Sequence, residues 1–146
     1  MATAYTASGV ASGIQTRTNV TGVITELVSY TLTAAFVVND TVAFLVLPAN
    51  SRLWDIGLDV DPLDTTTGIV LAAGTSASPS LFISGSTIGR SSTSGVQRAN
   101  VGGTINYTST TDQTIVMKVT TAPTSGLSTG TVRLGVVYTM SANSNS

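Results

Sequence analysis

The alternation of apolar and polar residues limits the possible folds of this 146-residue chain more than any other feature. In residues 54–60, WDIGLDV, apolar residues occupy every second position, and Asp or Gly fills the positions between. Side chains of a β-strand point to opposite faces in turn, so this pattern predicts a strand whose buried face includes Trp54. Seven other segments are strand-like in composition or alternation. They cover residues 22–33, 41–47, 68–73, 80–84, 103–109, 114–120 and 130–139.

Composition and turn residues both favour an all-β fold. Ser and Thr make up nearly a third of the chain, whereas Glu and Lys, which are common in helices, occur once each. Pairs such as Asn39-Asp40 and Asp61-Pro62 fall where the alternation stops, which is typical of turns between strands. Strands at this spacing, with no helical stretch between them, indicate an antiparallel β-sandwich or barrel of about eight strands.

A chain of this length normally forms one domain. The expected strands place that domain at residues 22–140, between a segment at 1–21 and a short C-terminal tail at 141–146. Residues 1–21 are mostly Ala, Ser, Thr and Gly, with too little apolar content for a core of their own, and the Gly/Ser-rich loop at 85–103 shares this composition. Each of these two segments is interpreted as either functional or disordered.

Charge and cysteine content exclude several classes of function. Only 9% of the residues are charged, and the six Lys and Arg residues are scattered singly, so no basic patch for nucleic acid is expected. No apolar run approaches the roughly 20 residues of a membrane-spanning helix, and no basic cluster indicates binding to a membrane surface. The chain has no Cys, which excludes a disulfide scaffold and a thiolate nucleophile. Neither nucleic acid nor a membrane is therefore an expected partner.

Three aspartates, Asp59, Asp61 and Asp64, gather in LDVDPLDTTTG, residues 58–68. On an extended strand Asp59 and Asp61 share the polar face about 7 Å apart, where water reduces their repulsion to about 0.6 kcal/mol. A calcium ion held by Asp61, Asp64 and residues 65–67 is one alternative, but Ca²⁺ takes six to eight oxygen ligands. Asp-Pro followed by Asp-Thr is also usual in turns, so we interpret the stretch as a strand end and turn, without metal or cofactor.

No arrangement of catalytic residues stands out. A glycosidase pair needs two acids in a cleft with aromatic residues that hold the sugar, but the aspartates are predicted at an exposed strand end. The chain has no His, so a Ser nucleophile would need a Lys base. Lys118 lies on an alternating strand without a Ser-x-x-Lys signature. The sequence therefore predicts a protein that is not an enzyme and has no catalytic residue.

Three stretches resemble small β-proteins encoded among the virion genes of tailed bacteriophages. They are NDTVAFLVLPANSRLWDIGLDVDPLDT (39–65), SLFISGST (80–87) and GTVRLGVVYT (130–139). The resemblance lies in the Leu-Pro-Ala turn before a strand that ends Leu-Asp-Val-Asp-x-Leu-Asp-Thr, and in the final Gly-Thr-Val-Arg-Leu strand. It implies a jelly roll like that of capsid decoration proteins, which typically trimerise and cement neighbouring major capsid subunits, sometimes through extended arms.

The resemblance, together with a low-charge surface suited to close packing, predicts a structural virion protein. We expect it to be made in the host bacterial cytoplasm and to lie on the outside of a bacteriophage capsid. There it would stabilise the head as a homotrimer that binds the major capsid protein. Two alternatives remain. One is a neck, tail or fibre-base protein of the phage, and the other is a carbohydrate-binding jelly roll, which the few aromatic residues do not favour.

Contacts with the capsid or with other subunits are expected in two places. An extended N-terminal arm, residues 1–21, would lie across a neighbour and pair with a sheet edge. Its larger side chains are Tyr5, Val10, Ile14 and Arg17. Residues 41–47, TVAFLVL, are apolar on both faces, so Leu45 and Leu47 would either contact a subunit or be covered within the monomer.

Overall fold

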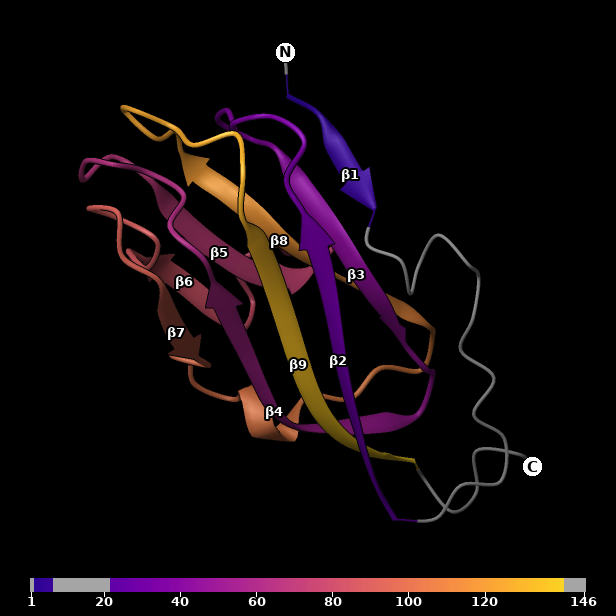
Figure 1. Ribbon diagram of the computed structural model, residues 1–146. Helices are drawn as coiled ribbons and strands as arrows, with labels where there is room; N and C mark the ends of the chain where they lie inside the picture. Colours follow the sequence, from indigo (N-terminus) through magenta and orange to yellow (C-terminus); the bar gives the residue numbers. More distant parts are fainter. Residues whose placement is uncertain (1, 7–21, 141–146) are drawn as a thin grey trace.

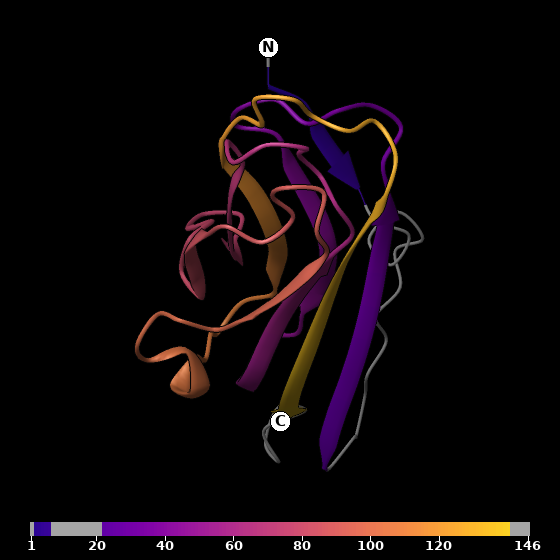
Figure 2. The same cartoon turned by 60° about the vertical axis from the view of Figure 1, so that its left-hand side comes forward.

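The computed structural model describes residues 2–6 and 22–140, which form two β-sheets packed face to face (Figures 1 and 2). No α-helix occurs in this part of the chain, and its one short helix is a 3-10 turn, η1, at Thr104–Asn106. None of the described helical residues forms a segment long and apolar enough to cross a membrane.

One sheet has five strands and the other has four. In spatial order, the five-stranded sheet consists of β1 (Ala4–Thr6), β3 (Thr41–Leu47), β8 (Gln113–Thr121), β5 (Val70–Thr75) and β6 (Ile83–Ser86). The four-stranded sheet consists of β2 (Val23–Thr31), β9 (Thr131–Met140), β4 (Ser51–Val60) and β7 (Gly95–Arg98). Neighbouring strands are antiparallel except β1 and β3, which are parallel.

The order of strands β2 to β9 is that of a jelly roll. The chain crosses from one sheet to the other at every connection from β2 to β5, and again at every connection from β6 to β9. This places β2, β9, β4 and β7 in one sheet and β3, β8, β5 and β6 in the other, as in the eight-stranded double Greek key. The predicted all-β antiparallel sandwich is confirmed, with nine strands in the described residues.

The core lies between the sheets and follows from strand alternation. On β9, every second residue from Val132 to Tyr138 is buried. Burying a large apolar side chain contributes roughly 1.5–3 kcal/mol, so this layer supplies most of the driving force for folding. The largest fully buried side chains are Tyr138, Phe44, Phe82, Leu45, Leu47, Leu53, Ile56, Leu58, Leu63, Ile69, Leu71 and Ile83.

A β-bulge in β4 reverses the direction of the only tryptophan. The pairing of β4 with β9 shifts between Leu53 and Asp55, so Trp54 is the extra residue. Leu53 is buried, whereas the Trp54 side chain is 42% exposed on the outer side of the sheet. The prediction that Trp54 lies on the buried face is therefore wrong, because strict alternation takes no account of a bulge.

A second bulge, in β3, places two successive apolar residues in the core. The pairing of β3 with β8 shifts between Ala43 and Leu45, and both Phe44 and Leu45 are fully buried. Leu47 is buried as well. Because Leu45 and Leu47 are enclosed, they offer no surface to another subunit. The structure corrects that expectation in favour of the alternative, in which the monomer itself covers them.

The start of the predicted arm is part of the sandwich. Residues 4–6 form β1, which lies beside β3 at the edge of the five-stranded sheet (Figure 1). The ring centre of Tyr5 lies 5.2 Å from that of Tyr30 and 6.0 Å from that of Phe36. Tyr5 therefore packs on the core of its own chain. The other side chains predicted for the arm, Val10, Ile14 and Arg17, lie outside the described residues, as does the tail at 141–146.

Two segments of the domain differ from the sequence prediction. The strand predicted at 103–109 is wrong, because Gly103 adopts a left-handed conformation with φ of 87° and the next three residues form η1. The segment at 85–103, expected as a loop, contains the end of β6 and all of β7, which pairs with β4. Arg90 of this segment donates from Nε to the carbonyl oxygen of Ile69 at 2.7 Å, which fixes the chain between the two strands.

Candidate interaction surface

The candidate functional surface is the side of the four-stranded sheet that faces away from the core, which we call the outer face. Cross-strand pairing arranges its side chains in rows that run from β2 over β9 and β4 to β7. The first row consists of Thr25, Val137 and Asp55. The central row consists of Leu27, Gly135, Gly57 and Arg98. The third row consists of Ser29, Arg133, Asp59 and Val96.

Exposed apolar side chains gather on the outer face. Seven large hydrophobic residues of the described chain are exposed, and four of them lie here. They are Val23 (68% exposed), Leu27 (70%), Trp54 (42%) and Val96 (64%). Single exposed apolar residues are normal, but a group of them on one face is typical of a surface that another molecule covers.

Two paired glycines form a trough in the middle of this face. Gly57 and Gly135 are directly opposite each other on β4 and β9, and they form the floor of a hollow of about 350 Å³. Leu27 lines one side of the hollow, and Asp55 and Arg98 line the other. The trough exists because two neighbouring positions of the sheet carry no side chain.

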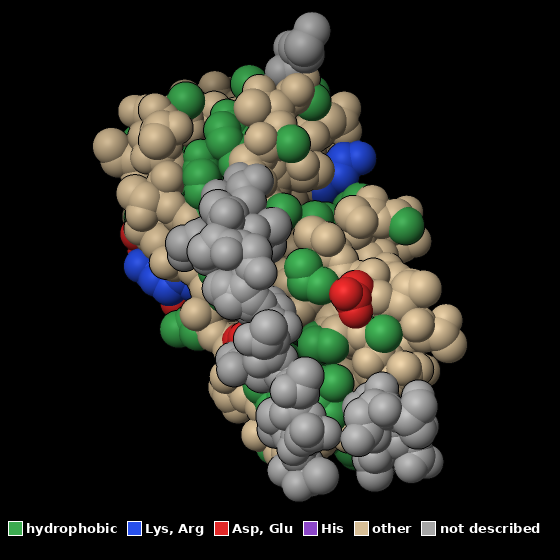
Figure 3. All heavy atoms as spheres, turned by 90° about the vertical axis from the view of Figure 1, so that its right-hand side faces the viewer, with side chains coloured by type: hydrophobic (Ala, Val, Ile, Leu, Met, Phe, Trp, Pro, Cys, Tyr) green, Lys and Arg blue, Asp and Glu red, His purple; other side chains and the backbone are tan. Residues whose placement is uncertain are grey.

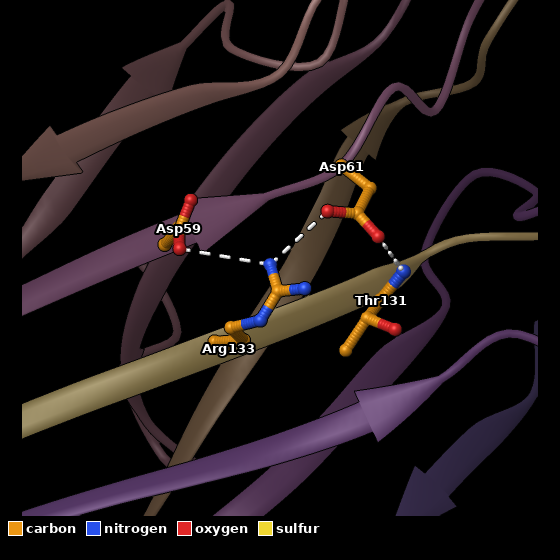
Figure 4. A network of polar contacts seen from close by, with 4 residues as sticks. All are labelled: Asp59, Asp61, Thr131 and Arg133. Atoms are coloured by element: carbon orange, nitrogen blue, oxygen red, sulfur yellow. Dashed lines mark hydrogen bonds and ion pairs between the residues drawn. The ribbon is translucent and has the colours of Figure 1, made fainter.

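Charged groups on the outer face are paired with one another. Arg98 forms an ion pair with Asp55. Arg133 donates from one terminal nitrogen to Asp61 at 3.1 Å and lies 3.6 Å from Asp59 (Figure 4). The second oxygen of Asp61 accepts a hydrogen bond from the Thr131 amide at 2.9 Å. The hydrogen bond from Arg133, with that from Thr131, holds the pKa of Asp61 below its ordinary value.

Trp54 is held by its neighbours at one end of the outer face. Its indole nitrogen donates to the hydroxyl of Thr139 at 2.9 Å. The guanidinium of Arg52 lies 4.5 Å from the ring centre, a cation–π contact that covers one side of the indole. Arg52 also donates to Asn106, so η1 is joined to this end of the sheet.

Few charged groups interrupt the surface elsewhere. On the side of the molecule shown in Figure 3, backbone atoms and uncharged, non-hydrophobic side chains make up most of the described surface, with hydrophobic groups between them and few charged ones. This agrees with a chain in which 9% of the residues are charged. Contacts on such a surface remove few charges from water.

Asp64, the last of the three clustered aspartates, is fully buried rather than exposed. Its carboxylate accepts from the hydroxyl of Thr66 and from five backbone amides, at distances between 2.7 and 3.1 Å. These amides belong to Thr66, Gly68, Ile69, Thr124 and Ser125. Burial alone would raise the pKa of Asp64, but the hydrogen bonds outweigh it and hold the pKa well below its ordinary value.

The aspartate-rich stretch is therefore a strand end followed by a turn, and its members have different surroundings. Asp59 and Asp61 share Arg133 at the surface, whereas Asp64 joins its own turn to the loop at 122–126. The described residues contain no group of three or more acidic side chains placed to hold a metal ion. The oxygens of Asp64 accept hydrogen bonds from backbone amides, an environment typical of a carboxylate with a structural role.

The residues of the trough were missed by sequence reasoning. Alternation predicts Gly57 on the polar side of its strand, but Gly135 comes from a strand 78 positions later and becomes its partner only through the sheet register. A glycine in the middle of an otherwise regular strand was the available signal at both positions.

Comparisons with known proteins show where a similar fold occurs. No known protein family and no curated protein matches the sequence. Among solved structures, the chain is similar to one in the capsid of Ralstonia phage GP4, with 22% identity and a TM-score of 0.76 over 94% of this chain and 98% of that one. A chain of the Cyanophage Pam1 capsid asymmetric unit is 24% identical, with a TM-score of 0.73 over 87% of this chain and 95% of that one.

A third similar chain belongs to the acid-stable capsid of the Helicobacter pylori bacteriophage KHP30, with 19% identity and a TM-score of 0.52. That match covers 80% of this chain and 94% of the other. The chain thus has a fold that occurs in bacteriophage capsid structures, and nearly the whole length of each neighbour takes part in the match. The resemblance to jelly-roll virion proteins is confirmed at the level of the fold.

Proposed function

We propose that this chain is a structural protein of a bacteriophage virion that binds the outside of the capsid and cements neighbouring major capsid subunits, without catalysis. The observation that carries the proposal is the match of nearly the whole fold to chains of phage capsid structures. Fold alone does not determine function, but an accessory role suits a small jelly roll with an exposed apolar face.

The partners that we propose are the major capsid protein and further copies of this chain, as a homotrimer. Most oligomers of identical chains are closed and symmetric, and a low-charge surface favours close packing against a neighbour. The remaining arm residues, Val10, Ile14 and Arg17, are proposed to contact the shell, whereas Tyr5 packs within the chain.

A neck, tail or fibre-base position is the main alternative, because such a protein would have the same kind of surface. The two positions differ in symmetry. Electron cryomicroscopy of the intact particle should show the chain as trimers distributed over the capsid shell. Rings at the portal vertex or along the tail would contradict capsid decoration and support the alternative.

Carbohydrate binding is a second candidate, favoured by one observation. Trp54 is exposed and donates to the Thr139 hydroxyl, and its neighbour Arg52 is bonded to the Asn106 amide. An exposed Trp in such polar surroundings is typical of sugar sites. Arg52 covers one side of the ring, which leaves less of it for stacking. A glycan array probed with the purified chain distinguishes the two functions: we expect no saturable binding, and binding that is lost in Trp54→Ala would favour the sugar-binding function.

A further inference from the structure

The two glycines of the trough have no evident use inside the chain. Glycine is unfavourable in the interior of a strand, so its presence there usually has a specific reason. Neither Gly57 nor Gly135 has the left-handed backbone that requires glycine. A β-carbon at Gly57 would meet only the carbonyl oxygen of Gln97, at 3.9 Å, and one at Gly135 would meet Leu27 at 3.6 Å. Both are ordinary van der Waals distances, so the small size of these residues points to close approach by something outside the chain.

A side chain that fits the trough protrudes from the same face. Leu27 lies on β2, the edge strand of the sheet, and is 70% exposed. Within its own chain it leans toward Gly135, which leaves the floor at Gly57 open. A leucine side chain that arrives from outside would find an apolar seat there, closed on its far side by the Arg98–Asp55 pair.

The charges of the outer face suit a second copy of this chain. The face and its rim carry three arginines and three aspartates, so they have no net charge. These residues are Arg52, Arg98, Arg133, Asp55, Asp59 and Asp61. Five of them are already paired with opposite charges within the same chain. A face with a net charge would repel an identical face, whereas here five of the six charges are already balanced within each copy.

We propose that copies of this chain associate through the outer face, with Leu27 of one copy seated over Gly57 of its neighbour. The proposal rests on the self-association that belongs to the proposed function, and it adds the surface and the residues in contact. Contact would also cover Val23, Trp54 and Val96, which are exposed on the same face. Apolar anchors at the centre of an interface, with charged groups around them, are the usual distribution in stable assemblies.

The positions of Leu27 and of the trough floor at Gly57 are compatible with a closed ring of copies. Leu27 lies on the edge strand, and the open floor lies two strands away at Gly57. Because Leu27 and Gly57 are separate parts of the face, the contact can repeat from head to tail around a threefold axis, as a trimer requires. A twofold pair, with each Leu27 over the Gly57 of the other copy, would satisfy the same contact, and the mass from sedimentation distinguishes the two.

The test is sedimentation equilibrium of the purified full chain and three variants. Gly57→Val fills the trough, and Leu27→Ser removes the inserted side chain without touching the core. Each should raise the dissociation constant of the oligomer by roughly tenfold or more, while the far-ultraviolet circular dichroism stays that of the wild type. Gly102→Val is the matched control, because Gly102 also has space for a side chain but lies in a loop away from the sheet, and its dissociation constant should not change.

A wild-type chain that remains monomeric at hundreds of micromolar would overturn the proposal, and so would an oligomer that both variants leave intact. Folded variants that still oligomerise but no longer attach to capsids would show that the trough receives the capsid protein instead. Capsid binding is measured separately with undecorated particles. If the wild-type chain does not bind these particles, the proposed function is contradicted. That result does not affect the proposal about how copies of the chain associate.

Discussion

Gly68 and Gly57 are both glycines of the same sandwich, but their surroundings are opposite. A β-carbon at Gly68 would lie 2.3 Å from the hydroxyl oxygen of Thr124 and 2.6 Å from its amide nitrogen, in the turn around Asp64. A β-carbon at Gly57 would have no neighbour closer than 3.9 Å. The turn therefore needs glycine for its own packing, whereas the outer face does not.

The carboxylates of the two regions differ in the same way. Asp64 is fully buried and holds six hydrogen bonds from residues of its own turn and of the loop at 122–126. Asp61 lies at the rim of the outer face and shares a surface arginine with Asp59. The residues that hold this fold together are thus different from those available to a partner. Each group can therefore be substituted without altering the contacts of the other.

The largest effect is expected from Asp64→Ala. The substitution leaves five backbone amides of a buried turn without their acceptor, and each unsatisfied buried group costs about 1–3 kcal/mol, part of which water that enters the site recovers. We expect a loss of at least about 4 kcal/mol in the free energy of unfolding, measured by urea denaturation. Asp61→Ala, three residues earlier, is the control and should cost far less. Similar losses in both variants would contradict the distinction between the two regions.

A smaller loss is expected from Gly68→Ala. The added methyl group overlaps Thr124, so the loop at 122–126 must move and its hydrogen bonds to Asp64 lengthen. Overpacking of this kind costs about 1–3 kcal/mol, which lowers Tm by several degrees in a domain of this size. Gly102→Ala, where a β-carbon meets nothing within 4 Å, is the matched control and should leave Tm unchanged. An unchanged Tm in Gly68→Ala would mean that the turn is looser than its contacts indicate.

Acid should destabilise the folded chain mainly through the turn around Asp64. The pKa of Asp64 is lowered in the folded chain, so its contribution to stability is complete above the unfolded value of about 3.9 and is lost as pH falls toward the folded pKa. The lowered pKa of Asp61 acts in the same direction. Urea midpoints should be constant from neutral pH to about pH 5 and fall below about pH 4. The Asp64→Ala variant should show a shallower fall, and an equally steep one would assign the acid effect to other carboxylates.

The sequence predicted the class of fold because strand alternation and turn residues are local. Most strands follow from it, including residues 130–139, whose alternation gives the buried face of β9 directly. The bulge at Trp54 was not predictable, since it depends on how β4 pairs with β9. β7 was also missed, because it is short and polar and its pairing with β4 defines it.

The candidate surface was harder to predict than the fold for the same reason. The trough needs Gly57 and Gly135 to be opposite each other, and only the sheet register places them so. The environment of Asp64 likewise depends on amides of Thr124 and Ser125, 60 positions further along the chain. In such cases the sequence shows which residues are unusual, but their contacts depend on the tertiary structure.

The smallest effect on stability, and the one with the opposite sign, is expected from Gly57→Ala. Alanine restricts the unfolded chain more than glycine does and fits the strand without overlap, so the free energy of unfolding should rise by about 0.4–1 kcal/mol. Thermal melting of the dilute monomer is the measurement, because an oligomer would add a concentration-dependent term to Tm. The same methyl group begins to fill the trough, so self-association should weaken while the monomer becomes more stable. A Gly57→Ala monomer that is less stable than the wild type would show that the glycine has an internal role after all, and the contrast with Gly68 would no longer hold.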